Sequence, residues 1–180
     1  MIHTVVKVGG AALGRDLSPL AGLGPGVLVV PGGGPFADTV RVVDDRLGIG
    51  DDASHWAAIL AMDQYAYVLA SLVPGARLVR EPSEAGPGDL AVLAPFDWLH
   101  AMDPLPHSWD VTSDSIAAWV AVAVGAARLL LVKPVSDGGV DKYFECVRAG
   151  LDVRLLGVDA IDTIQTVLAE PAAWAHLSSP

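Results

Sequence analysis

Residues 4–10, TVVKVGG, and residues 27–34, VLVVPGGG, decide the fold class of this chain. Each stretch is a short run of mostly β-branched apolar residues that ends at consecutive glycines. Such runs are typical of strands that are buried on both faces of a parallel sheet. Apolar runs at 90–93 and 129–132 repeat the pattern, and helical patterns separate the runs. The alternation predicts an α/β fold, a three-layer α/β/α sandwich around a mostly parallel sheet.

Working outward from these two stretches, the same reasoning places the other elements. We expect strands at 4–8, 27–30, 77–79, 90–93, 129–132 and 153–156. We expect helices at 36–47, 51–73, 113–124, 140–149 and 161–168. In the first helix, apolar residues at spacings of four, three and four predict one stripe, formed by Phe36, Val40, Val43 and Leu47. Asp51 or Asp52 could cap the second helix, and Ser113 or Asp114 the third.

The composition describes a folded protein with an acidic surface. Of the 180 residues, 52% are hydrophobic and 18% are charged, and the formal net charge is −10. An apolar chain can offset its ordering entropy by burial, so disorder is not expected. An acidic surface repels phosphate backbones and anionic lipid, which argues against nucleic-acid and membrane-surface partners. An anionic substrate is still possible where a local positive site overcomes the global field.

Two features bear on compartment and membrane association. The chain has a single cysteine, Cys146, which cannot form an internal disulfide and fits a reducing cytoplasm. Residues 1–10 lack the pattern of a signal peptide. Residues 56–73 are nearly long enough to span a bilayer, but Asp63 and Gln64 lie in their middle. A central Asp is costly in lipid, so we expect a buried helix or one packed between subunits.

Three segments are candidates for anion binding, because each could present backbone N–H groups at the edge of the sheet. They are Lys7 to Gly10, Pro31 to Pro35 and Thr112 to Ser115. A tight turn would account for any single glycine cluster, but three in one α/β chain point to a site. Ligands of parallel sheets bind beyond the carboxyl ends of the strands.

Lys7 is the unusual residue of this set. It lies inside a strand that should be buried on both faces, where a lysine is costly without an anionic partner. Its ammonium could reach solvent past the strand end, or it could meet a phosphate there. Phosphoryl transfer needs positive groups around the migrating phosphoryl. Asp114 could hold such a lysine in place.

The ordered set of motifs resembles the amino-acid-kinase superfamily. The matching stretches are VVKVGGAAL (5–13), VVPGGGPFAD (29–38), VTSDSIAAWVA (111–121) and LLLVKPVSDGG (129–139). The resemblance covers most of the chain. HWAAILAMDQYAYVLA (55–70) and LPHSWDVTSDSIAAW (105–119) are similar to the branch that contains the [5-(aminomethyl)furan-3-yl]methyl phosphate kinases of methanofuran-type biosynthesis.

The resemblance implies a carbamate-kinase-like fold, ATP and Mg²⁺ as cofactors, and a small anionic acceptor. It implies that Lys7 stabilises the transferring phosphoryl, that Asp114 orients lysines and that Ser113 lies near the acceptor. Backbone N–H groups of a glycine set would bind phosphate: Gly9, Gly10, Gly32, Gly33 and Gly34. The magnesium would be held mainly by the nucleotide phosphates, with no protein metal cluster.

The resemblance also implies a second lysine from the nucleotide half. Lys142, in GGVDKYFECVRAG (138–150), and Lys133 are both candidates. We prefer Lys142 for catalysis, although a solvated helix position would equally explain it. Lys133, Asp137 and Gly138 would then bind the nucleotide.

We expect one domain over residues 1–180, with 1–125 mainly the acceptor half and 126–180 a shortened nucleotide half. The shortening is a departure from the superfamily, whose members usually carry a longer segment after the Asp-Gly turn. The helix at 51–73 predicts a homodimer or a higher homo-oligomer, since it is apolar all round. Trp56 and Trp109 could wall the substrate pocket.

Two other functions remain open at this point. One is a kinase of the same fold with another acceptor, such as isopentenyl phosphate, UMP or an amino-acid carboxylate. The other is a non-catalytic protein that binds a small anion, which the short nucleotide half would favour.

Overall fold

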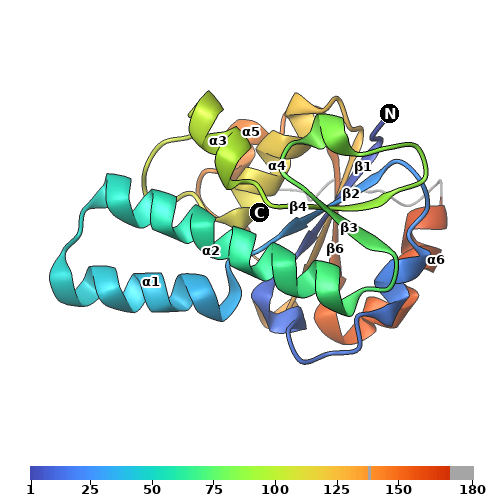
Figure 1. Ribbon diagram of the computed structural model, residues 1–180, viewed down its shortest axis with the longest axis horizontal. Coiled ribbons are helices and arrows are strands. Elements are labelled where there is room, and N and C mark those ends of the chain that lie inside the picture. Colours follow the sequence, from blue (N-terminus) through green and yellow to red (C-terminus); the bar gives the residue numbers. More distant parts are fainter. Residues whose placement is uncertain (138, 171–180) are drawn as a thin grey trace.

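The centre of the molecule is a six-stranded sheet with the order β3-β4-β2-β1-β5-β6 (Figure 1). The computed structural model describes residues 1–137 and 139–170. The strands are β1 (Thr4–Val8), β2 (Val27–Pro31), β3 (Ala76–Val79), β4 (Leu90–Leu93), β5 (Arg128–Lys133) and β6 (Asp152–Gly157). All neighbouring strands run parallel, so the predicted fold class is confirmed.

Helices cover both faces of the sheet. They are α1 (Gly34–Leu47), α2 (Asp51–Leu72), α3 (Phe96–Met102), α4 (Ser113–Ala123), α5 (Phe144–Val147) and α6 (Ile164–Ala169). The predicted helices at 36–47, 51–73 and 113–124 are confirmed within two residues. The prediction at 140–149 is wrong in extent, because only the single turn of α5 forms there. The predicted last helix is divided between a 3-10 segment, Val158–Thr163, and α6.

Both expected helix caps are corrected. Gly50 precedes α2 with a φ of 87°, and Asp51 and Asp52 lie inside its first turn. Thr112 caps α4, since its hydroxyl oxygen accepts the backbone N–H of Asp114. Helix α3 was not predicted; its first backbone N–H, that of Phe96, donates to Asp63 Oδ1 at 2.9 Å.

The side-chain alternation along β1 explains the two cores. Val5 packs with α4 on one face of the sheet. Val6 and Val8 pack on the other face with α6 and with three 3-10 segments, Gly10–Ala12, Ser18–Gly22 and Val158–Thr163. Lys7 is two residues from Val5 and therefore points toward the α4 face. The pleat of β1 thus aims the one buried lysine of this strand at the start of α4.

Helices α1 and α2 form an antiparallel hairpin that extends beyond the sheet (Figure 1). No residue of α1 is buried. The predicted apolar stripe is present, but Val43 is 38% exposed and Leu47 is 72% exposed, so its outer half is uncovered. Among the helices of the described residues, none is long and apolar enough to cross a membrane.

Candidate active site

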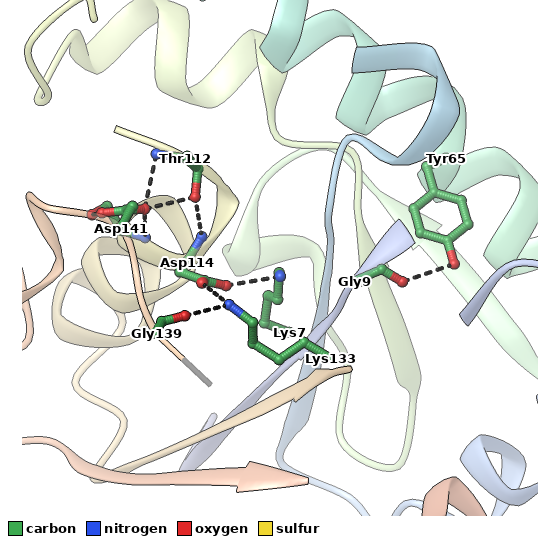
Figure 2. A network of polar contacts seen from close by, with 9 residues as sticks. Lys7, Gly9, Tyr65, Thr112, Asp114, Lys133, Gly139 and Asp141 are labelled. Atoms are coloured by element: carbon green, nitrogen blue, oxygen red, sulfur yellow. Dashed lines mark hydrogen bonds and ion pairs between the residues drawn. The ribbon is translucent and has the colours of Figure 1, made fainter. Parts of the chain in front are cut away.

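Two lysines and one aspartate meet at the carboxyl edge of the sheet (Figure 2). Lys7 comes from β1, Asp114 from the first turn of α4, and Lys133 from the end of β5. Lys7 Nζ lies 2.8 Å from Asp114 Oδ1, and Lys133 Nζ lies 2.9 Å from Asp114 Oδ2. Lys133 also donates to the carbonyl oxygen of Gly139 at 2.7 Å. The aspartate therefore holds both ammonium groups in fixed positions.

The cluster is buried and carries an excess positive charge. Lys7 is 5% exposed and Asp114 is 3% exposed. Burial raises the pKa of Asp114, but the charges and hydrogen bonds of Lys7 and Lys133 outweigh this effect and hold the pKa below its usual range. Two ammonium groups against one carboxylate leave one positive charge uncompensated. A desolvated charge is costly without a counter-ion, so this geometry suits an anionic ligand such as a phosphoryl group.

The glycine turns after β1 and β2 pack directly against each other. A Cβ atom on Gly10 would lie 2.3 Å from the Cα atom of Gly34, which no real pair of atoms tolerates. A Cβ atom on Gly32 would lie 3.3 Å from Ser113 Oγ, and one on Gly9 would lie 3.4 Å from Lys7 Nζ. The glycines therefore allow the two turns, α4 and the buried lysine to come together. We call this region, Gly9–Gly10 and Gly32–Gly34, the glycine cradle.

A cavity of about 670 Å³ adjoins the cradle. Gly10, Gly33 and Gly34 line it at one end, and Ser113 lines it at the start of α4. Its apolar walls include Ile59 and Met62 of α2 and Val111 and Ile116 beside α4. The cavity is large enough for a small metabolite, and it combines these apolar walls with polar side chains, among them Asp38, Arg41 and His55.

Asp141 fixes the start of α4, and the sequence reasoning did not single it out. Its Oδ2 accepts the backbone N–H and the hydroxyl of Thr112 at 2.9 and 2.7 Å and the N–H of Ser115 at 3.0 Å. Its Oδ1 accepts the hydroxyl of Ser115 and the N–H of Tyr143. These bonds tie the loop after β5 to the helix turn that carries Asp114. No local pattern signals such a role, because the partners lie far apart in the sequence.

Tyr65 of α2 is a second contact that the sequence did not reveal. Its hydroxyl donates to the carbonyl oxygen of Gly9 at 3.3 Å. Burial raises the pKa of Tyr65 to about 12, so the hydroxyl keeps its proton. The bond anchors the middle of α2 to the glycine cradle.

The structure separates the two candidate lysines of the nucleotide half. Lys133 joins the cluster, whereas Lys142 Nζ pairs with Asp110 Oδ1 at 2.7 Å and its side chain is 81% exposed. This correction reverses our preference for Lys142, because the described contacts do not bring it to Lys7 or Asp114. Asp137 is the last residue of a 3-10 turn beyond β5, and Gly138 lies outside the described residues. Of the two tryptophans expected at the pocket, Trp109 lines the cavity and Trp56 does not.

Comparison with known proteins identifies the family to which this chain belongs. The model of the amino acid kinase family matches residues 3–138 of this chain. The [5-(aminomethyl)furan-3-yl]methyl phosphate kinase of Methanocaldococcus jannaschii is 31% identical over 150 residues, covering 77% of this chain and 68% of that protein. The chain therefore belongs to the amino acid kinase family. The prediction that it is a phosphotransferase is confirmed at the level of this family.

A solved structure supports the fold independently. The crystal structure of uridylate kinase from Archaeoglobus fulgidus matches with a TM-score of 0.53 at 18% identity, over 73% of this chain and 62% of that one. The match thus spans less than two thirds of the uridylate kinase chain. At this identity the likeness shows the fold alone.

Proposed function

We propose that this protein transfers the γ-phosphoryl group of ATP to [5-(aminomethyl)furan-3-yl]methyl phosphate, forming the diphosphate in the biosynthesis of a methanofuran-type one-carbon carrier. An oxygen of the acceptor phosphate would form a bond to the γ-phosphorus while the bond to the ADP oxygen breaks. The acceptor oxygen is already ionised at neutral pH, so the reaction needs no general base. The named relative supports this acceptor by its 31% identity.

The observation that carries the proposal is the Lys7–Asp114–Lys133 cluster. Phosphoryl transfer is catalysed mainly by positioning and by stabilising charge on the migrating group. Lys7 and Lys133 would bind the oxygens of that group, and Asp114 would keep the two ammonium groups in place. Backbone N–H groups of the glycine cradle would bind the phosphates on either side of it.

The donor nucleotide and its metal belong to the proposal as well. The excess positive charge beside the cradle fits the phosphates of ATP, which would lie on the β5 side with Lys133. Within the described residues, no group of three His, Cys, Asp or Glu side chains is arranged to hold a metal ion. Mg²⁺ would therefore be held mainly by the nucleotide phosphates, whose oxygens it prefers.

We also propose a homodimer as the working form. The exposed outer half of α1, with Val42 at 55% and Leu47 at 72%, gives it an apolar surface that a second copy could cover. The partners that we expect are small anions and a second copy of the chain. We do not expect nucleic acid or a membrane as a partner. The cytoplasmic location stays a prediction.

The function is tested by measuring ADP release from Mg-ATP with four acceptors: the furanylmethyl phosphate, isopentenyl phosphate, UMP and acetylglutamate. We expect release with the furan compound at least about tenfold faster than with the others. Faster release with another acceptor would identify a different kinase of the same fold. If no acceptor is turned over, the midpoint of thermal unfolding, measured with each ligand, shows whether the protein binds ATP or only the furan phosphate. A rise with the furan phosphate and none with ATP would indicate a binding protein.

A further inference from the structure

The end of the cavity farthest from the glycine cradle contains a buried histidine with an open hydrogen-bonding edge. His55 of α2 lines the cavity and is 7% exposed. Within the described residues no hydrogen bond is found for either of its ring nitrogens. Its ring stacks on His107, with centroids 4.3 Å apart, and meets the edge of Trp56 at 4.8 Å. Buried polar groups rarely lack partners, so a ligand in the cavity is the natural partner for this ring.

The helix sets the separation of His55 from the cradle. Tyr65 contacts the carbonyl oxygen of Gly9, so its part of α2 lies at the cradle. His55 precedes Tyr65 by ten residues, which places it roughly 15 Å further along the helix axis. Ile59 and Met62 line the cavity between them. A ligand that reaches both ends must therefore carry polar groups at two ends and an apolar body between them.

The charges at the two ends are of opposite sign. The cradle end has the excess ammonium charge of the lysine cluster. Around the far end the carboxylates outnumber the cations, as the contacts show. Asp44 accepts the Trp109 indole N–H at 2.8 Å, and Asp52 and Asp103 lie 2.7 and 2.8 Å from the ring nitrogens of His107. Arg41, which lines the cavity 4.5 Å from the Trp109 ring, and His107 itself are the cations in these contacts. Such a field orients a molecule that carries a phosphate at one end and an ammonium at the other.

We infer that the far end of the cavity is an ammonium subsite, in which a His55 ring nitrogen accepts a hydrogen bond from the acceptor's primary amine and the surrounding carboxylates of Asp44, Asp52 and Asp103 supply the compensating field. The inference rests on the proposed function and deepens it, because it assigns the residue that would select an acceptor with an amine at the end opposite its phosphate. The remaining specificity then comes from the length of the apolar body.

The protonation of the two stacked histidines supports this role. Burial and, to a smaller extent, the charge of His107 lower the pKa of His55 to about 4, against the opposing charges of Asp103 and Asp52. The hydrogen bonds of Asp52 and Asp103 raise the pKa of His107 above its usual value. His107 therefore takes the proton of the pair, and His55 keeps the lone pair that an ammonium donor requires.

The test compares the aminomethyl acceptor with an analogue that has a methyl group in place of the aminomethyl group. Calorimetric binding and turnover with Mg-ATP are measured for the wild type, His55→Phe and His100→Phe. The phenyl ring keeps the stacking but removes the nitrogen. His100 is the matched control, since it packs on Trp56 at 4.7 Å but is exposed and does not line the cavity.

We expect the wild type and His100→Phe to bind the amine about tenfold or more tightly than the analogue. In His55→Phe the ratio should fall to within about threefold, and His55→Gln, whose amide oxygen can accept, should keep part of it. Equal binding of the two compounds by the wild type, or an unchanged ratio in His55→Phe, would overturn the subsite. Selective binding without any turnover would support the subsite and reject the proposed kinase function.

Discussion

At the scale of single residues, Lys7 is the most informative residue of this sequence, because it lies in a buried strand. Its cost in an apolar environment predicted an anionic partner, and the structure provides Asp114 at 2.8 Å. Which second lysine joins it could not be predicted. Lys133 ends β5 and Lys142 lies nine residues further on, so the place where β5 ends and the path of the chain after it decide which ammonium reaches Asp114.

Replacing each of these two lysines by alanine in turn compares their contributions to the reaction rate. Lys133→Ala should lower kcat by about a hundredfold or more, because it removes a charge from the migrating phosphoryl group. Lys142→Ala should stay within about twofold of the wild type, since its exposed pair with Asp110 contributes little. Steady-state rates with Mg-ATP and the preferred acceptor measure both. A hundredfold loss in Lys142→Ala with normal rates in Lys133→Ala would restore the assignment made from the sequence.

At the scale of elements, the strands and long helices follow from local patterns, and the short elements do not. Helix α3 depends on Asp63, thirty-three residues earlier, which accepts its first N–H. Helix α5 is shorter than its pattern predicts, and Asp141, just before it, has its carboxylate bonded to the start of α4 and to Tyr143. Local sequence contains neither partner. The glycine cradle could be predicted as a set of turns, but not as two turns in contact.

Replacement of Gly10 by alanine tests that contact. The new methyl group would meet the backbone of Gly34 at 2.3 Å, so the cradle must move apart. We expect a loss of about 1–3 kcal/mol in unfolding free energy and at least about tenfold in kcat/KM. Urea unfolding and initial rates measure the two effects.

The matched control is Gly24→Ala, where an added Cβ meets nothing within 4 Å. It should leave both quantities near the wild-type values. A Gly10→Ala variant that behaves like Gly24→Ala would show that close approach of the two turns is not needed for the site.

At the scale of the whole molecule, the parallel sheet and its layers could be predicted because buried strands and amphipathic helices alternate along the chain. The walls of the cavity could not be predicted, because they come from four segments that lie far apart in the sequence. The tryptophan that lines it, Trp109, bonds to Asp44 of α1. The histidine pair joins α2 to the segment after α3 through His107, Asp52 and Asp103.

This histidine pair makes stability depend on pH in two separate windows. The folded pKa of His107 is raised, so its stabilising effect is complete below pH 6.5, the unfolded value, and is lost as the pH rises through the folded value. His55 has a lowered folded pKa, about 4, so stability falls as the pH drops from 6.5 toward 4. Below pH 6.5 the buried carboxyl of Asp63, whose pKa burial raises to about 6, opposes the effect of His55, so the urea midpoint should decline clearly only above pH 6.5.

His107→Asn should abolish the decline above pH 6.5. The same urea series from pH 4 to 9 checks the variant against the wild type. An unaltered alkaline decline in His107→Asn would assign it to other groups.

The dimer expected from the α1–α2 hairpin is tested by Val43→Glu with Leu47→Glu. Charges on this exposed apolar stripe should convert a dimer into a monomer without unfolding the chain, because neither residue is buried. Sedimentation velocity measures the state. Tyr67→Glu, on the exposed surface of α2, shows whether charge on the second helix has the same effect. A wild type that sediments as a monomer would contradict the prediction outright.

The central claim is that phosphoryl transfer occurs at the Lys7–Asp114–Lys133 cluster. Phosphorus NMR of the protein with Mg-ATP and the aminomethylfuran methyl phosphate tests it most directly, with Lys7→Ala as the comparison and circular dichroism to confirm that the variant folds. The account predicts new diphosphate signals and ADP with the wild type, and a rate about a thousandfold lower with Lys7→Ala. Full activity in a folded Lys7→Ala variant, or intact ATP with the wild type, would contradict it.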